Sequence, residues 1–225
     1  MTERIVSIEI IGSERSPVAI VDNFSADPQA LVATAVGADF QMRGEFYPGP
    51  RAPAPRSYFE EAAKVLTPIA IRVFGGTTSL QLDRALYSIA TTRPDDLSLA
   101  QRIPHIDDVR KSAFAVVHYL GKAEFGGTAF YRHRSTGYET VGEARHARYL
   151  AALKADFMRL GEPPAAYIAG DTPVFERIFA ASARFNRAVI YHSSLLHCAE
   201  LPNDIPLPTD AAEGRLTIAS FLTIK

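Results

Sequence analysis

The chain has 225 residues, 47% of them hydrophobic, which is enough for one folded domain with a substantial core. Its 24 basic and 25 acidic residues give a net charge of -1, so it lacks the basic excess typical of proteins that bind nucleic acids. The single cysteine, Cys198, excludes a disulfide within the chain and favours a reducing compartment. No stretch approaches the roughly 20 apolar residues that a membrane-spanning helix needs. We therefore expect a cytoplasmic protein with neither a nucleic-acid nor a membrane partner.

The N-terminal segment combines strand and helix patterns. Alternating apolar and polar residues over Arg4–Ile11, and a β-branched run at Val18–Val21, predict two strands. A helix is predicted over residues 28–36, because Ser25 or Asp27 can cap it and a proline occupies its first turn.

A proline-rich segment, residues 47–56, precedes a second predicted helix over Ser57–Phe74. Its four prolines and one glycine indicate a surface loop, and loops of this kind often border a functional site. Arg43, Arg51 and Arg56 cluster around it. Three such charges are more typical of a solvated loop than of a phosphate site, so we interpret them as solvated.

Residues 79–225 predict a β-rich core. Short segments rich in β-branched and aromatic residues are separated by Gly, Pro and Asp, and one helical pattern, Glu143–Leu160, lies in an insert at residues 134–172. The predicted strands are Ser79–Ala90, Ile103–Val109, Ala113–Leu120, Thr128–His133, Phe175–Phe185, Ala188–Tyr191, Leu196–Ala199 and Arg215–Ile224. Many short strands with turn signals indicate a sandwich or barrel. We predict one domain over residues 1–225, mainly β with α, in which residues 1–78 and the helical insert flank a jelly-roll-like core.

The segment Pro104-His105-Ile106-Asp107 carries the clearest chemical signal. In a strand, residues i and i+2 point to the same face, so His105 and Asp107 present an imidazole and a carboxylate side by side. His197, on a later strand, is a candidate for a third ligand. Two histidines and one carboxylate with open positions opposite are typical of Fe(II) oxygenases, in which a 2-oxo acid takes two positions and leaves one for O₂. Because H-x-D often arises by chance, this interpretation depends on further features.

Arg215, at the start of the last predicted strand, is one such feature. A guanidinium is always charged and binds a carboxylate through two parallel hydrogen bonds, which suits the distal carboxylate of 2-oxoglutarate. Strand alternation places Thr217 on the same face, where its hydroxyl can bind the same carboxylate. Taken alone, Arg215 is equally compatible with an arginine that faces solvent at a strand start.

The order of these features resembles the Fe(II)/2-oxoglutarate-dependent dioxygenases, and the bacterial members of the prolyl-hydroxylase-like branch are the most similar. The resemblance covers about residues 84–225 and includes the H-x-D, the Tyr119-Leu120 strand end, the Phe125-Gly-Gly-Thr128 turn, the distal histidine and the Arg-x-Thr strand. It implies a double-stranded β-helix, or jelly roll. It also implies residue roles: His105, Asp107 and His197 bind Fe(II), while Arg215, Thr217 and Tyr119 contact 2-oxoglutarate.

The implied reaction is hydroxylation of a small-molecule or peptidyl substrate with release of succinate and CO₂, with ascorbate as an auxiliary reductant. Two alternatives stay open: a cupin-like metal-binding protein or dioxygenase that does not use 2-oxoglutarate, and a non-catalytic jelly-roll binding module. His192 remains a rival to His197 as the third ligand. We expect residues 44–56, 134–172 and 201–214 to form the walls of the substrate pocket.

Overall fold

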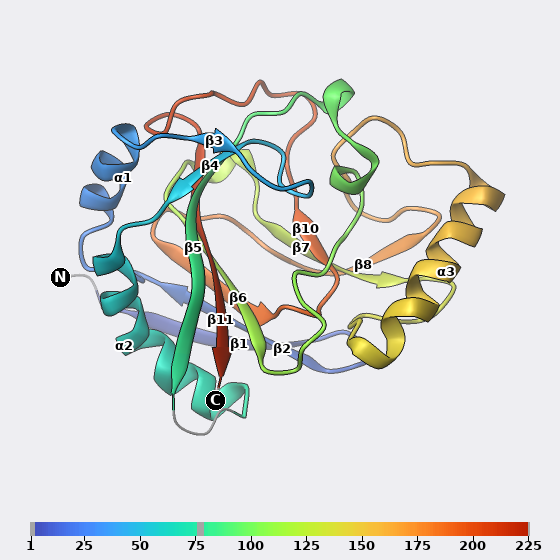
Figure 1. The fold of residues 1–225 in the computed structure, drawn as a ribbon, viewed down its shortest axis with the longest axis horizontal. Coiled ribbons are helices and arrows are strands. Elements are labelled where there is room, and N and C mark those ends of the chain that lie inside the picture. The colour runs from blue at the N-terminus through green and yellow to red at the C-terminus, as the bar shows by residue number, and fades with distance from the viewer. Residues whose placement is uncertain (1–2, 76–78, 225) are drawn as a thin grey trace.

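The computed structural model describes residues 3–75 and 79–224, and it is mainly β with a few helices (Figure 1). The larger sheet has eight strands in the order β1-β2-β9-β6-β11-β5-β4-β3, and the smaller sheet has three in the order β10-β7-β8. All of the paired strands are antiparallel. The strands are β1 (Ile5–Ile11), β2 (Ser16–Asp22), β3 (Gln41–Met42), β4 (Pro50–Pro53), β5 (Leu80–Ala90), β6 (Ala113–Tyr119), β7 (Thr128–His133), β8 (Phe175–Ala181), β9 (Arg187–His192), β10 (His197–Ala199) and β11 (Arg215–Ile224).

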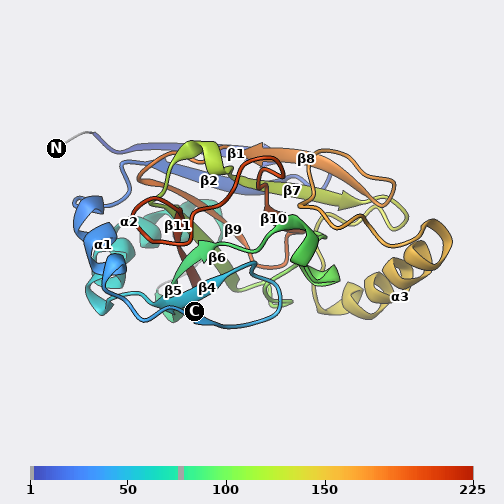
Figure 2. The same cartoon turned by 90° about the horizontal axis from the view of Figure 1, so that it is seen from above.

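In the described part of the chain, three α-helices flank these sheets. Helices α1 (Pro28–Val36) and α2 (Arg56–Val73) lie at one end of the molecule, and α3 (Glu143–Leu160) lies at the other (Figures 1 and 2). The Asp27 carboxylate caps α1 by accepting a hydrogen bond from the Ala30 amide. The buried side of α2 packs in one apolar cluster with side chains of the larger sheet. No helix within the described ranges is long and apolar enough to cross a membrane.

A second apolar cluster fills the space between the two sheets. Ala115, Tyr119 and Tyr191 from β6 and β9 of the larger sheet pack with Phe130 and Ala181 from β7 and β8 of the smaller one. Side chains from facing sheets interdigitate in this way because each sheet must bury one face. The packing fixes β7 and β8 against the larger sheet, and the candidate metal centre lies beside this cluster.

Two predicted segments differ from the structure. Ile103–Val109 is not a strand, because its only bridge joins His105 to His197. Pro104 has no amide hydrogen to donate, and the Asp107 amide donates to the Ser193 carbonyl rather than to β10, so no ladder of hydrogen bonds forms. Residues 47–56 are not wholly a loop, because Pro50–Pro53 forms β4 on β5. The prolines are tolerated there because β4 lies near the sheet edge, flanked only by the two-residue β3.

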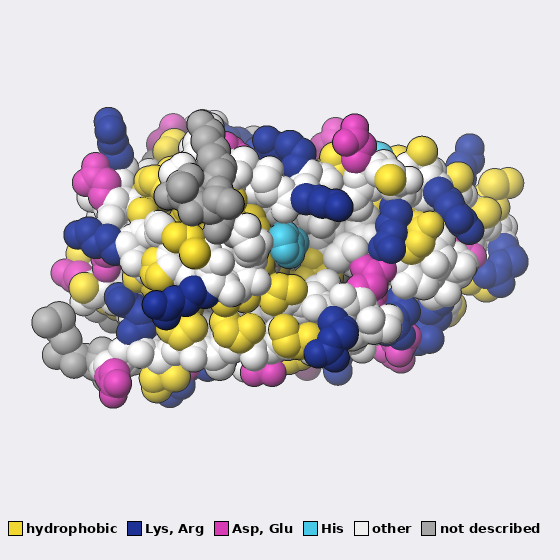
Figure 3. Space-filling model, turned by 90° about the horizontal axis from the view of Figure 1, so that it is seen from below, with side chains coloured by type: hydrophobic (Ala, Val, Ile, Leu, Met, Phe, Trp, Pro, Cys, Tyr) yellow, Lys and Arg dark blue, Asp and Glu magenta, His cyan; other side chains and the backbone are white. Residues whose placement is uncertain are grey.

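On the face drawn in Figure 3, basic side chains are scattered among apolar and acidic ones rather than gathered in a stripe. Many of the basic side chains are paired: Arg132, Arg145 and Arg187, for example, form ion pairs with Glu139, Glu14 and Asp22. The near-neutral composition of the chain is thus reflected in local pairing of opposite charges.

Candidate metal centre

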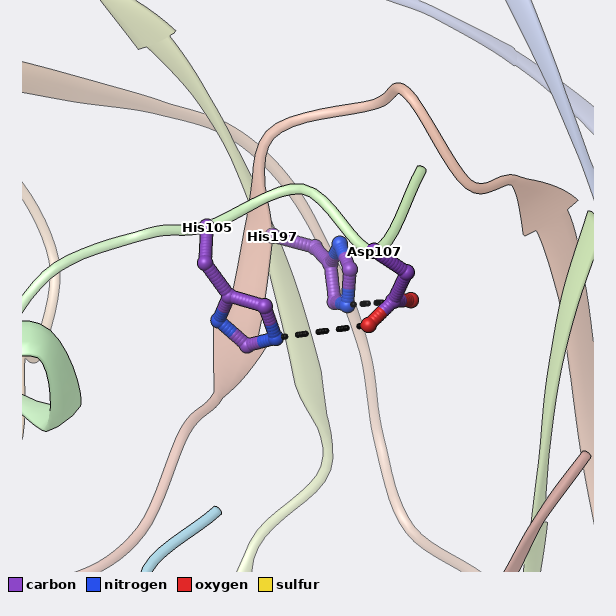
Figure 4. A group of neighbouring side chains, drawn as sticks. All are labelled: His105, Asp107 and His197. Atoms are coloured by element: carbon purple, nitrogen blue, oxygen red, sulfur yellow. Dashed lines mark ion pairs between the residues drawn. The ribbon is translucent and has the colours of Figure 1, made fainter. Parts of the chain in front are cut away.

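The side chains of His105, Asp107 and His197 converge on one point (Figure 4). His197 begins β10, and His105 exchanges two backbone hydrogen bonds with it, at 2.8 and 3.0 Å. The Asp107 amide donates to the Ser193 carbonyl at 2.8 Å, which holds the H-x-D segment along the chain that leads into β10. One donor atom from each of the three side chains lies within 4.8 Å of the others.

The imidazoles are oriented towards the carboxylate. His197 Nε2 lies 3.4 Å from Asp107 Oδ2, and His105 Nε2 lies 3.7 Å from Oδ1. The opposite ring nitrogen of His197, Nδ1, donates a hydrogen bond of 2.8 Å to the Leu195 carbonyl. Because a carbonyl only accepts, the proton sits on Nδ1 and the lone pair of Nε2 is free for a ligand.

Burial sets the electrostatics of this group. It lowers the pKa of His105 well below its usual value, and the neighbouring His197 and Arg51 lower it further. Burial also raises the pKa of Asp107, although His197 and Arg51 oppose that shift. The His105 ring is therefore neutral at pH 7, and the Asp107 carboxylate lies where water solvates it poorly.

The three residues fit a divalent transition-metal ion. Two imidazole nitrogens and one carboxylate are the donors that such ions take in an open site. Ligand atoms about 2.0–2.2 Å from one ion lie about 3 Å from their neighbours, slightly less than the separations found here. Among the described residues, no side chain or amide donates a hydrogen bond to the Asp107 carboxylate, and a buried carboxylate needs a cation or donors.

Arg215, Thr217 and Tyr119 lie together beside this group. Thr217 of β11 is directly opposite Tyr119 of β6 in the sheet register. Arg215 is 3% exposed, so the solvent-facing alternative is wrong. Its guanidinium carbon lies 5.7 Å from the centre of the Tyr119 ring, and Arg215 and Thr217 line the same pocket as the three candidate ligands.

Two carbonyl oxygens of the Gly126-Gly127 turn accept hydrogen bonds from Arg215. Arg215 Nε donates to the Gly126 carbonyl at 3.2 Å and Nη2 donates to the Gly127 carbonyl at 2.9 Å. Gly126 has a φ of +81°, and a Cβ atom at either glycine would overlap a backbone carbonyl oxygen, that of Glu200 or of Ala181. Only glycine permits this close approach.

The pocket is also lined by Tyr47, Arg51, Thr128 and Tyr191. Tyr47 and Arg51 lie in the segment expected to form a pocket wall, but none of the four was predicted individually as a site residue. The prediction of a solvated Arg51 is wrong, because its side chain points into this pocket and stacks on Tyr47, 4.4 Å from the ring centre. Arg51 reaches the pocket because β4 pairs with β5, where Arg51 lies opposite Ser88. That pairing cannot be predicted from the sequence.

His192, the rival third ligand, lies away from His105 and Asp107. Its ring packs against Phe74 and Phe114, with ring centres 5.2 and 4.6 Å away. His105, in contrast, is stacked on the exposed Phe46, whose ring centre lies 5.5 Å from its own. The structure therefore brings His197, and not His192, to the other two side chains.

Of the three segments expected to form the pocket walls, only residues 44–56 contribute to the described lining. The end of the insert at residues 134–172 instead borders a separate, mostly apolar cavity of about 450 Å³ together with Arg102 and Ile103. Helix α3 lies at one end of the molecule (Figure 2), where Tyr149 and Leu153 pack in an apolar cluster with Ala129 and Tyr131 of the smaller sheet.

No curated protein matches the sequence. Solved structures that share the fold include the non-haem α-ketoglutarate-dependent epimerase SnoN from nogalamycin biosynthesis (TM-score 0.51, 11% identity, 94% of this chain and 79% of that one). They also include HygX from Streptomyces hygroscopicus with nickel and 2-oxoglutarate bound (0.52, 11%, 94% and 84%) and the non-haem α-ketoglutarate-dependent carbocyclase SnoK from nogalamycin biosynthesis (0.51, 15%, 94% and 81%). At these identities the likeness shows a common fold.

Comparison with protein families gives a match that spans nearly the whole chain. The matching model covers residues 2–222 and is described as "Family of unknown function (DUF6445)". The chain therefore belongs to the DUF6445 family.

Proposed function

We propose that the protein is an Fe(II)- and 2-oxoglutarate-dependent oxygenase that hydroxylates a small-molecule or peptidyl substrate. The observation that carries this proposal is the convergence of His105, Asp107 and His197 in a pocket that also contains the buried Arg215. The fold shared with SnoN, HygX and SnoK supports it. In the same proposal the two sheets are the two halves of a jelly roll within one domain, and the chain is closest to the prolyl-hydroxylase-like branch.

In this proposal His105, Asp107 and His197 hold the iron. Bound there, Fe(II) would activate O₂, so that one oxygen atom enters a substrate C–H bond and the other enters succinate as 2-oxoglutarate loses CO₂. The protein keeps both imidazoles in position: the Leu195 carbonyl orients His197, and the backbone pairing with β10 orients His105. The carboxylate of Asp107 supplies the negative charge that favours a divalent cation.

Arg215 would bind the distal carboxylate of 2-oxoglutarate. Its Nε and Nη2 groups are held by the carbonyls of Gly126 and Gly127, so its position is fixed and its charge is not neutralised by an acidic side chain among the described residues. Tyr119, whose hydroxyl lies 2.6 Å from Thr128 Oγ1, lies beside it. An anion offsets the cost of burying this cation.

The experiment is an assay of succinate release from 2-oxoglutarate by purified protein loaded with Fe(II), in air and without added substrate. We expect slow release that requires Fe(II) and falls at least about 100-fold in Asp107→Asn, because that change removes a charged ligand. Asp108→Asn is the matched control, since Asp108 is the adjacent carboxylate and pairs with Arg110 instead. Release that survives Asp107→Asn would come from free iron, and no release from metal-loaded parent protein would contradict the proposal.

A further inference from the structure

Three buried polar atoms of residues that line the pocket beside the metal centre have no hydrogen-bond partner among the described residues: Ser220 Oγ, the hydroxyl oxygen of Tyr47 and Nε of Arg51. The Tyr47 and Arg51 side chains are stacked on each other. Buried polar atoms almost always have partners in folded proteins, so an unpaired pair at a pocket wall indicates a missing ligand.

The sheet register places Arg51 on the same face as Thr217 and Tyr119, two of the residues proposed to contact 2-oxoglutarate. Arg51 of β4 is opposite Ser88 of β5, Ser88 is opposite Thr217 of β11, and Thr217 is opposite Tyr119 of β6. Residues directly opposite one another in an antiparallel sheet share a face. Arg51 and Arg215 therefore approach one pocket from two strands that are separated by β5.

The two arginines serve different parts of this pocket. The ring of Phe46, which precedes Tyr47 in the chain, stacks on His105 with ring centres 5.5 Å apart, so the segment that carries Tyr47 and Arg51 lies beside His105. The Arg215 guanidinium is instead held by the Gly126 and Gly127 carbonyls, 5.7 Å from the centre of the Tyr119 ring. Arg51 thus lies on the side of His105, and Arg215 lies on the side of the interior Tyr119.

Arg51 presents a charge that the protein itself leaves unpaired. Among the described residues it forms no ion pair, and its guanidinium stacks on the Tyr47 ring at the pocket wall. A half-buried guanidinium without an anion is unfavourable, and a carboxylate matches its planar pair of N–H groups. The Tyr47 hydroxyl can donate a further hydrogen bond to the same carboxylate.

Building on the proposed function, we propose that Tyr47 and Arg51 form a second carboxylate-binding subsite, separate from Arg215 and adjacent to the metal centre. The carboxylate has two possible sources that share this chemistry. It is either the carboxylate of 2-oxoglutarate beside its keto group or a carboxylate of the substrate. In the second case the enzyme selects an anionic substrate.

Calorimetric titration of 2-oxoglutarate into Ni(II)-loaded protein tests the subsite without turnover. The variants are Arg51→Gln and Tyr47→Phe, and Arg215→Lys serves as the comparison for the other carboxylate. The matched control is Arg84→Gln, because Arg84 is exposed, stacks on Phe221 and also places a positive charge near Asp107. Nickel affinity is measured first for each variant, so that loss of the metal or of the fold is seen separately.

If the carboxylate belongs to 2-oxoglutarate, Arg51→Gln weakens its binding at least about tenfold, Tyr47→Phe weakens it less, and Arg84→Gln changes it less than about threefold. If 2-oxoglutarate binding is unchanged, acetate is titrated into the nickel-loaded protein with 2-oxoglutarate present, with acetamide as its uncharged counterpart. Acetate binding that acetamide lacks and that Arg51→Gln abolishes assigns the subsite to the substrate.

The inference is overturned if Arg51→Gln binds 2-oxoglutarate like the parent and no Arg51-dependent acetate binding is found. Failure of the proposed function gives a different result: the parent itself then binds no nickel at the three ligands, or binds nickel but no 2-oxoglutarate. In that case the titration with acetate and acetamide still decides whether Tyr47 and Arg51 bind a carboxylate.

Discussion

At the scale of single residues, Asp107 reduces the stability of the metal-free protein. Burial raises the pKa of its carboxyl group, so the folded protein holds this proton more tightly than the unfolded chain does. The charged carboxylate therefore destabilises the metal-free fold at neutral pH. A cation bound between Asp107 and the two imidazoles offsets this cost, which couples metal binding to folding.

His118 makes folding stability depend on pH. It is buried between the rings of Phe24 and Tyr58, its Nε2 lies 3.0 Å from Asn186 Oδ1, and burial lowers its pKa from 6.5 to about 4. Between these values the unfolded chain binds a proton that the folded protein does not. The free energy of unfolding should therefore fall as pH drops through this window, by about 2–3 kcal/mol for this group.

Urea denaturation at pH 7 and pH 4.5 measures this effect. His118→Gln, which keeps an N–H group for Asn186, should reduce the loss of stability between the two pH values, and the exposed His146→Gln on α3 serves as control. An equal loss in the parent and in His118→Gln would show that His118 is not responsible.

At the scale of elements, the Gly126-Gly127 turn joins the two sheets to Arg215. In Gly127→Ala the new Cβ would overlap the Ala181 carbonyl oxygen, so the turn must move away from β8. We expect a loss of about 2–4 kcal/mol in the free energy of unfolding, seen as a fall in Tm of at least about 4 °C. Gly37→Ala is the control, because a Cβ there meets only one atom, at 3.9 Å. Equal Tm values for the two variants would contradict this account of the turn.

Elements with strong local patterns could be predicted from the sequence. Helix α3 and strand β11 have the predicted bounds, and β1, β2, β5 and α2 differ by few residues. Segments whose structure depends on distant partners could not. Pro50–Pro53 lacks any strand pattern and becomes β4 only because β5 lies beside it, while residues 103–109 have a strand pattern without a neighbour that supplies a ladder.

The candidate site was partly predictable for the same reason. His105 and Asp107 are two residues apart, so any extended segment brings them together, and His197 follows from its place at the start of β10. Arg215 and Thr217 share a face because β11 alternates regularly. Tyr47 and Arg51 reach the pocket through pairing of β4 with β5, which connects parts of the chain that local patterns cannot relate.

At the scale of the whole molecule, the arrangement of the two sheets brings the proposed iron ligands and the proposed carboxylate-binding arginines into one pocket. Strand β10 of the smaller sheet carries His197, while β4 and β11 of the larger sheet carry Arg51 and Arg215. The apolar cluster between the sheets buries this region. The pocket thus has a low-dielectric setting in which a metal ion and two carboxylates would meet fixed partners.

X-ray diffraction at the iron absorption edge, from crystals grown without oxygen in Fe(II) and 2-oxoglutarate, tests this account most directly. We expect one anomalous peak about 2.0–2.2 Å from Nε2 of His105, Nε2 of His197 and the Asp107 carboxylate, with density for 2-oxoglutarate extending to Arg215. Iron bound elsewhere, or no anomalous peak among these three side chains under saturating Fe(II), would contradict it.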